Sequence, residues 1–268
     1  MKRMRWVAVA LVALMAASCA TWVGSKPALR VGMTPNYPPL AMMRDGFATG
    51  AECDFAVQLA KDLGLELDLN EIPWERQFDD LAASKIDIVM SGVTVTPARQ
   101  ARAAFCEPYM NNPLVAVARR GESGRYADAA AVTAATGGIG ILRDTAADTF
   151  VRRHFGNGKI LPLSSRNDVV FYLANQRIDL YVDDLAAAVD IVSRDEAKLE
   201  LVPIPLANQE LAWAVRTDDA VLRQKANEAL VRWRENGVLD RILTRWLPYR
   251  QALQVALSQA AASAADGK

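Results

Sequence analysis

Small polar residues and one arginine form the first segment whose side chains could bind a ligand. Ser91, Gly92 and Thr94 follow an apolar segment that is typical of a buried strand. Arg99 lies in the first turn of the helix expected after them. Small residues at the carboxyl end of a strand let a ligand approach the backbone, and a carboxylate there would gain from both the guanidinium and the helix N-terminus. The pattern indicates a carboxylate site, unless Arg99 is a surface residue paired with Glu107.

This chain has few residues that suit hydrolytic catalysis or metal binding. His154 is the only histidine, so a Ser-His-Asp triad could use no other position, and no Gly-x-Ser-x-Gly motif occurs. The three cysteines show none of the Cys/His spacings of zinc sites. We therefore expect no metal, no cofactor and no enzymatic activity.

Length and charge also restrict the function. The chain has 268 residues, 51% of them hydrophobic, which suffices for one large domain or two small ones. Lys and Arg total 31 and Asp and Glu total 31, so the formal net charge is zero. A nucleic-acid binder is expected to show a basic excess, and here the basic residues are scattered. Nucleic acid is not an expected partner.

The elements that must position these residues alternate along the chain. Short apolar segments are separated by segments with helical spacing, such as that of Phe55, Leu59 and Leu63. This alternation favours an α/β fold with mainly parallel sheets. Expected strands are 29–33, 65–72, 86–90, 138–142, 160–163 and 178–182, and expected helices are 54–63, 75–84, 145–155, 167–175, 184–192, 220–235 and 238–246.

The N-terminus has the features of an export signal. Three basic residues precede an apolar stretch, 6–17, that is too short to span a membrane. We expect residues 1–18 to be a signal peptide. The sequence Ala-Ala-Ser before Cys19 resembles a bacterial lipobox, with lipid on Cys19 as the first mature residue. Ordinary cleavage near Ser18 is the alternative, and either way the mature chain would be periplasmic.

The remaining cysteines and the C-terminal tail leave two further questions open. Cys53 and Cys106 could form a disulfide in an oxidising compartment. Their Cα atoms would have to lie within bonding distance, and the sequence does not place them. The tail 251–268, rich in Ala, Gln and Ser, is expected to be a frayed helix that passes into disorder.

Several segments together resemble the bacterial extracellular solute-binding proteins of family 3, the class that binds polar amino acids. They are 31–40 (VGMTPNYPPL), 85–99 (KIDIVMSGVTVTPAR), 105–109 (FCEPY), 177–184 (RIDLYVDD) and 237–246 (GVLDRILTRW). The resemblance extends over nearly all of the chain from Leu29 to Tyr249.

The resemblance implies roles for residues of the first half of the chain. In the family, the arginine at the position of Arg99 binds the α-carboxylate of an amino acid. Hydroxyl and backbone groups that match Ser91, Gly92 and Thr94 hold the carboxylate and the ammonium. The aromatic residue that matches Tyr37 covers the body of the ligand.

The second half of the chain is expected to close the site. Asp184 follows the expected strand 178–182 and matches the family aspartate that pairs with the ligand ammonium. It could instead, or as well, cap the next helix, because Asp is a favoured N-cap. Asp183 beside it has no expected role and would face solvent. Thr145 and the backbone N–H of Ala146 match the family's anion-binding turn.

The sequence departs from the family pattern at two positions. Asp144 stands where relatives have Gly, and it adds a negative charge near the expected carboxylate. It either caps the following helix or meets a cationic group of the ligand, and in the second case the usual carboxylate site is in doubt. Thr34 stands where some binders of basic amino acids have Asp. These changes leave the identity of the ligand open.

The resemblance implies the type II periplasmic-binding-protein-like fold, with two α/β lobes joined by two crossover strands. Lobe 1 would comprise 27–112 and 209–250, and lobe 2 would comprise 116–206, with crossovers near 111–113 and 205–209. The implied protein is a monomeric binding component of an ABC-type uptake system. It would close on a small zwitterionic solute, an amino acid or a related amine or carboxylate, and deliver it to an inner-membrane ABC permease.

Two other functions occur on the same scaffold. Cyclohexadienyl dehydratases, which act on prephenate or arogenate, need a general acid in the cleft, and where that pattern has Glu this chain has Ala187. A binding protein that signals to a membrane sensor is the other alternative.

Overall fold

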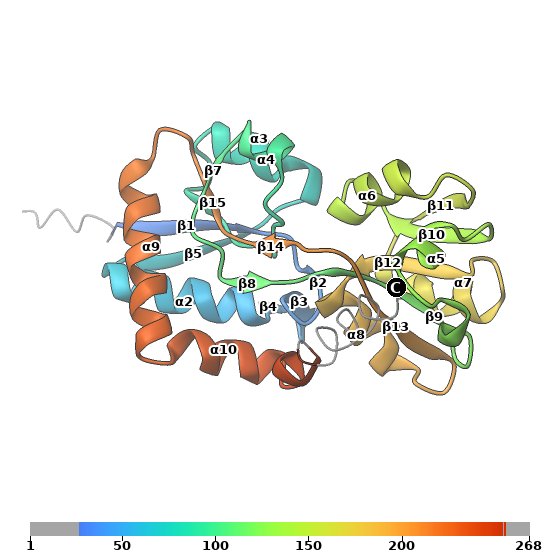
Figure 1. The fold of residues 1–268 in the computed structure, drawn as a ribbon. Coiled ribbons are helices and arrows are strands. Elements are labelled where there is room, and N and C mark those ends of the chain that lie inside the picture. Colours follow the sequence, from blue (N-terminus) through green and yellow to red (C-terminus); the bar gives the residue numbers. More distant parts are fainter. Residues whose placement is uncertain (1–26, 254, 256–268) are drawn as a thin grey trace, which may run out of the picture.

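The computed structural model describes residues 27–253 and 255, and they form two α/β lobes (Figure 1). Each lobe has its own five-stranded sheet with helices packed against it. The first lobe is built from two separate segments of the chain, and the second lobe lies between them in the sequence. The expected two-lobed α/β fold is confirmed.

The sheet of the first lobe has the strand order β5-β1-β6-β15-β7. Strand β1 lies between β5 and β6 and is parallel to both, with Val31 opposite Leu69 on one side and Ile88 on the other. The strands are β1 (Ala28–Met33), β5 (Glu66–Glu71), β6 (Ile88–Val89), β7 (Ala104–Phe105) and β15 (Ala214–Val215).

Helices of the first lobe enclose an aromatic core. Phe55 lies 5.3 Å from Tyr109 and 6.0 Å from Trp233 between ring centroids, and Trp213 packs among them. The helices are α2 (Ala51–Leu63), the 3₁₀ turn η2 (Trp74–Arg76), α3 (Gln77–Ala82), α4 (Pro97–Gln100), α9 (Ala220–Glu235) and α10 (Val238–Trp246). Helix α2 begins three residues earlier than expected and ends at Gly64, whose φ of 68° terminates it in the left-handed conformation.

The sheet of the second lobe has the order β11-β10-β12-β9-β13. Successive residues of β12 point to opposite faces, so Leu180 and Val182 pack in one hydrophobic cluster and Tyr181 in the other. The strands are β9 (Leu114–Arg119), β10 (Gly138–Leu142), β11 (Lys159–Leu163), β12 (Leu180–Asp184) and β13 (Leu199–Ala207). Both faces of this sheet are therefore buried.

Short helices cover the second sheet. They are the 3₁₀ turns η3 (Ser123–Arg125) and η4 (Arg166–Asp168) and the helices α5 (Ala129–Thr133), α6 (Ala146–His154), α7 (Val169–Ala174) and α8 (Leu185–Arg194). Helix α8 starts directly after the carboxyl end of β12, and α6 starts after a short turn, 143–145, at the carboxyl end of β10. Their N-termini therefore lie at the same edge of the sheet.

The two lobes are connected by chain segments that lie side by side. Strand β8 (Met110–Asn111) leaves the first lobe and pairs antiparallel with β14 (Glu210–Leu211), which returns to it. A small sheet of β2 (Asn36–Tyr37), β3 (Ala41–Arg44) and β4 (Phe47–Thr49) extends from the first lobe near this crossing. The crossing brings the residues after β6 in the first lobe close to the carboxyl ends of β10, β11 and β12 in the second.

The expectation of mainly parallel sheets was only partly right. The pairs β1–β5, β1–β6, β10–β11 and β10–β12 are parallel, and β9 and β15 pair antiparallel with their neighbours. Both exceptions directly follow a crossing between lobes, so they enter their sheets from the opposite direction. Alternation along the sequence does not indicate this reversal.

Some expectations fall outside the described residues. These are the signal peptide 1–18, the lipidation of Cys19 and most of the tail 251–268. Among the residues that are described, no helix is both long and apolar enough to cross a membrane. Cys53 and Cys106 are buried free thiols, so the disulfide considered from the sequence is not present.

Candidate ligand-binding site

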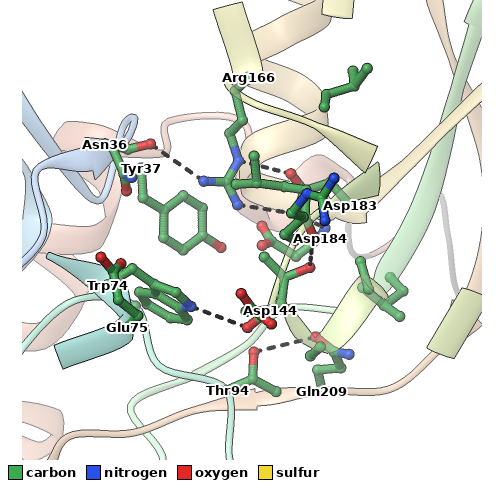
Figure 2. Close-up of a pocket in the computed structure, with 18 of the residues that line it drawn as sticks. Asn36, Tyr37, Trp74, Glu75, Thr94, Asp144, Arg166, Asp183, Asp184 and Gln209 are labelled. Atoms are coloured by element: carbon green, nitrogen blue, oxygen red, sulfur yellow. Dashed lines mark hydrogen bonds and ion pairs between the residues drawn. The ribbon is translucent and has the colours of Figure 1, made fainter. Parts of the chain in front are cut away.

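A cavity of about 260 Å³ lies between the two lobes (Figure 2). Six of the seven residues expected to bind the ligand line it, namely Tyr37, Gly92, Thr94, Arg99, Thr145 and Asp184. The other lining residues are Asn36, Trp74, Glu75, Leu114, Leu142, Arg143, Asp144, Ala146, Ala147, Leu163, Ser164, Arg166, Asp183 and Gln209. Ser91 is the expected residue that does not line it.

The turn after β6 requires glycine at position 92. Gly92 has a φ of 64°, a conformation that residues with a side chain rarely adopt. A Cβ atom there would also lie 2.5 Å from Cε1 of Tyr37. The close contact holds the Tyr37 ring against the turn, so the backbone of lobe 1 and this aromatic side chain form one wall.

A buried carboxyl group supports the same turn from behind. Glu52, in the first turn of α2, is fully buried and accepts hydrogen bonds from the N–H of Gly92, the hydroxyl of Tyr109 and the indole of Trp213. Burial raises the pKa of Glu52 to about 7, against the effect of its three donors. Sequence reasoning missed this residue, because a Glu in the first turn of a helix is usually exposed.

Ser91 has a different position from the one expected. Its hydroxyl is buried and accepts the backbone N–H of Thr34 at 2.9 Å. Thr34 in turn donates its hydroxyl to the carbonyl of Ile72 and accepts from Gln77. These bonds tie the ends of β1 and β6 together, and neither hydroxyl faces the cavity.

Arg99 is oriented by its surroundings rather than by an acidic partner. Thr96 caps α4 by accepting the N–H of Arg99, and the guanidinium donates to the carbonyl of Thr94 at 3.0 Å. The guanidinium also lies over the ring of Trp74, 5.1 Å from its centroid. Burial lowers the pKa of Arg99 to about 10, so it remains charged at neutral pH. It forms no ion pair with Glu107 or any other side chain that the structure describes.

Asp184 has both of the positions considered for it. It caps α8 by accepting the N–H of Ala187 at 3.1 Å, and it also lines the cavity. Its side chain is 7% exposed. Burial, and next the negative charge of Asp183, raise the pKa of Asp184 to about 6, although Arg166 and Tyr37 act in the opposite direction.

Asp183 does not face solvent, contrary to expectation. It is 2% exposed and forms a two-pronged ion pair with Arg166, with Nε at 2.8 Å and Nη2 at 3.3 Å from its oxygens. Tyr181 and the N–H of Asp184 donate to the same carboxylate. Burial alone would lower the pKa of Arg166, but the charge and hydrogen bond of Asp183, together with Tyr181 and Asp184, outweigh it and the pKa is raised.

The Tyr37 side chain contacts other residues through one face of its ring and through its hydroxyl. The guanidinium of Arg166 lies over its ring at 4.5 Å from the centroid, so this face is covered. Its hydroxyl accepts a hydrogen bond from Asn112 at 2.9 Å and lies beside Asp184. Burial raises the pKa of Tyr37 well above its usual value, which keeps the hydroxyl protonated. Asn112 also accepts the N–H of Ala186, and so joins both lobes at the crossing.

The turn before α6 excludes one of the two alternatives for Asp144. The N-cap of α6 is Thr145, which accepts the N–H of Asp148, so Asp144 is not the cap. Asp144 has a φ of 57°, a conformation that glycine adopts more readily, and its side chain is exposed. Its carbonyl accepts from the Trp74 indole at 3.1 Å (Figure 2). It also accepts from Arg99 at 3.4 Å. The turn therefore contacts lobe 1 directly.

Two buried or half-buried charges in the cavity have no ion-pair partner. Arg166 and Asp183 neutralise one another. Arg99 from lobe 1 and Asp184 from lobe 2 form no ion pair with each other or with another side chain in residues 27–253 and 255. In the same ranges, no group of three or more His, Cys, Asp or Glu side chains is placed to hold a metal ion. Among its buried or half-buried charges, the cavity thus has one unpaired cation from lobe 1 and one unpaired anion from lobe 2.

Sequence reasoning missed several lining residues, and the reasons differ. Trp74 precedes the expected helix 75–84, and only the folded chain brings its ring beneath Arg99. Arg166 and Asp183 are 17 positions apart, and nothing in their spacing indicates an ion pair. Gln209, which lies within hydrogen-bonding distance of Thr94, belongs to the second crossing and could have been suspected from its place there.

Comparison with known proteins supports a common ancestry with binding proteins. The family model for bacterial extracellular solute-binding proteins, family 3, matches residues 29–249. The L-cystine-binding protein TcyJ of Escherichia coli (strain K12) is 28% identical over 225 residues, which cover 84% of this chain and 84% of that protein.

Solved structures agree with this relationship. A binding component of an ABC transporter from Wolinella succinogenes DSM 1740, complexed with lysine, has a TM-score of 0.78 and 25% identity, covering 82% of this chain and 95% of that one. An ancestral amino acid-binding protein that is a precursor of cyclohexadienyl dehydratase has a TM-score of 0.74 and 24% identity, covering 82% and 94%. The second likeness shows the fold alone.

Proposed function

Because the chain belongs to the bacterial extracellular solute-binding proteins of family 3, we propose that it is the extracytoplasmic amino-acid-binding component of an ABC-type uptake system. Its relatives include binding proteins named for L-cystine and for histidine. The proposed ligand is an α-amino acid held between the lobes. We propose that the protein delivers this ligand to an inner-membrane permease, because other relatives are named as arginine-binding proteins of ABC transporters.

The observation that carries this proposal is the pair of unpartnered charges in the cavity. An α-amino acid has one carboxylate and one ammonium on the same carbon, and Arg99 and Asp184 face one cavity from opposite lobes. Each charge-assisted hydrogen bond to such a ligand is worth about 1.5–3 kcal/mol. A ligand of this kind compensates both protein charges, which are otherwise buried without a counter-ion.

The carboxylate would lie between Arg99 and the N-terminus of α6. The Arg99 guanidinium already reaches the carbonyl of Asp144, one residue before the cap of that helix. The hydroxyl of Thr145 is engaged as donor and acceptor within its own turn, so the backbone N–H groups at Ala146 and Ala147 are the available donors there. Backbone donation and the helix dipole both favour an anion at this place.

Closure of the lobes would couple binding to recognition by a membrane partner. In this conformation Trp74 and Arg99 donate to Asp144 across the cavity, and Arg166 donates to the carbonyl of Asn36. A ligand that contacts both lobes binds the closed form better than an open one, and so shifts the population toward it. The closed shape is what a permease would recognise.

We propose that no chemical reaction takes place in the cavity. A dehydratase on this fold needs a general acid beside the ligand. Ala187 occupies the position of that acid, and it is fully buried in α8 with its N–H donated to Asp184. Incubation of the purified protein with prephenate or arogenate, followed by measurement of the aromatic product, should show no turnover above the uncatalysed rate.

A thermal-shift screen of the common amino acids tests the proposed function. A ligand at one hundred times its Kd stabilises the folded protein by about 2.7 kcal/mol, which raises the melting temperature measurably. Each hit should be confirmed by calorimetry, which should give a stoichiometry of one ligand per protein. If no amino acid raises the melting temperature, the proposed function is wrong. Neighbouring genes for a permease and an ATPase would favour uptake over signalling to a membrane sensor.

A further inference from the structure

Arg166 is a buried cation that the chain supplies to its own cavity. It begins the turn η4, just after β11, and its side chain is 8% exposed. Two of its nitrogens bind the carboxylate of Asp183 at 2.8 and 3.3 Å. This geometry satisfies Asp183 on the side that faces the cavity (Figure 2). The ion pair lies wholly within lobe 2.

The same guanidinium also contacts lobe 1. Its carbon lies 4.5 Å from the centroid of the Tyr37 ring, and Nη1 donates to the carbonyl of Asn36 at 3.3 Å. Figure 2 shows Arg166 placed between Asn36 and Tyr37 on one side and Asp183 on the other. All four residues line the cavity. Arg166 therefore occupies a position that would otherwise be part of the ligand space.

The groups around Arg166 form a set that binds cations. A buried carboxylate, the face of an aromatic ring and a backbone carbonyl are each favourable for a guanidinium or an ammonium. In this protein the cation they hold belongs to the chain. A ligand with a basic side chain cannot use Asp183 or this face of Tyr37 while Arg166 is present.

The other charges of the cavity do not compensate for this loss. Asp184 is the remaining buried carboxylate among the lining residues, and the α-ammonium of the ligand would take it. Glu75 and Asp144 also line the cavity, but both are exposed, where pairing with a cation contributes little. Arg99, Arg143 and Arg166 would repel a further positive group on the ligand.

From this arrangement we propose, on the basis of the function proposed above, that Arg166 is a specificity-determining residue that excludes basic amino acids. The cavity accepts α-amino acids with neutral or acidic side chains, and Arg166 fills the place that a ligand's own guanidinium or ammonium would take. The ligand of the similar protein from Wolinella succinogenes, lysine, therefore does not carry over to this chain.

The test compares ligands of different charge in wild-type protein and in Arg166→Ala. Calorimetry should measure the affinities for L-arginine, L-lysine, L-glutamine, L-glutamate and L-cystine. Wild-type protein should bind its best neutral or acidic amino acid at least tenfold more tightly than L-arginine or L-lysine. In Arg166→Ala, Asp183 and the Tyr37 ring become free, so this ratio should shift by at least tenfold in favour of the basic ligands.

Three further variants separate specificity from general damage. Arg153→Ala removes an exposed cation that does not line the cavity, and it should leave the ratio unchanged. Asp183→Asn added to Arg166→Ala removes the carboxylate that would receive the basic ligand, so the gain should disappear. If Arg166→Ala does not fold, as judged by circular dichroism, Arg166→Gln keeps most of the volume and should shift the ratio in the same direction.

Three outcomes would decide the matter. Wild-type affinity for L-arginine or L-lysine equal to or above that for every other amino acid would overturn the specificity role of Arg166. A folded Arg166 variant with an unchanged ratio would overturn it as well. Binding of no amino acid of any charge would refute the proposed function itself, and with it this inference.

Discussion

Replacement of Asp184 by asparagine should change ligand affinity and stability in opposite directions. Asparagine has nearly the same shape and is an equally good N-cap, so the hydrogen bond from Ala187 that starts α8 should survive. What the substitution removes is a buried negative charge, 7% exposed and beside Asp183. The charge is needed by an ammonium ligand and opposes folding when no ligand is present.

The size of the stability effect follows from the pKa. In the folded protein the pKa of Asp184 is about 6 against an ordinary 3.8, and each unit corresponds to about 1.36 kcal/mol. Because the folded pKa is the higher one, the penalty is absent below pH 3.8, grows between the two values and is complete above about pH 6. Asp184→Asn should therefore raise the free energy of unfolding of the empty protein at pH 8 by about 1–3 kcal/mol.

The effect on binding has the other sign. Loss of one charge-assisted bond to the ammonium should weaken binding by about 1.5–3 kcal/mol, roughly 10–150-fold. The affinity of wild-type protein should fall below about pH 6, because Asp184 must release its proton to bind the ammonium. Urea denaturation at pH 8 and pH 4, with calorimetry from pH 5 to pH 8, measures both. A variant that binds normally, or that is less stable than wild type at pH 8, would refute this reasoning.

Further substitutions test other parts of the site. Arg99→Ala should lower ligand affinity by about 2–4 kcal/mol in calorimetry with an unchanged circular dichroism spectrum, and unchanged affinity would remove Arg99 from the site. Gly92→Ala should lower the free energy of unfolding, measured in urea, by about 1–3 kcal/mol, because the φ of 64° disfavours a side chain and the Tyr37 ring leaves no room for a Cβ. Equal stability would contradict this packing. Trp74→Phe removes the indole donor to Asp144 and keeps an aromatic ring under Arg99, so closure of the lobes should weaken by about 0.5–1.5 kcal/mol. X-ray scattering of the empty protein should then show a larger radius of gyration, and an unchanged radius of gyration would argue against this contact.

The sequence was sufficient for the fold because its local patterns agree with the observed elements. Helix α9 and helix α10 have the predicted bounds, and β10 covers the predicted residues. Strand β9 was missed although it is buried throughout its apolar centre, because no helical segment separates it from the crossing. Its antiparallel pairing depends on the direction in which the chain enters lobe 2, which local patterns do not record.

The site was predictable where one segment holds the whole motif. Gly92, Thr94 and Arg99 lie within a single strand, turn and helix, so their spacing alone places them on one wall. Arg166 and Asp183 come from different elements, and their pairing depends on the packing of η4 against β12. Asp183 was misjudged for the same reason, since a second aspartate at a strand end is usually solvated.

One calorimetric cycle tests most directly whether a zwitterion joins Arg99 to Asp184. The amino acid found by the screen is compared with its decarboxylated amine, in wild-type protein and in Arg99→Ala. If the guanidinium binds the carboxylate, loss of the carboxylate from the ligand should weaken binding to wild-type protein by about 2–4 kcal/mol and should weaken binding to Arg99→Ala little. The coupling free energy between the two changes should be about 1.5–3 kcal/mol. Losses that simply add, with no coupling, would show that the arginine and the carboxylate do not meet.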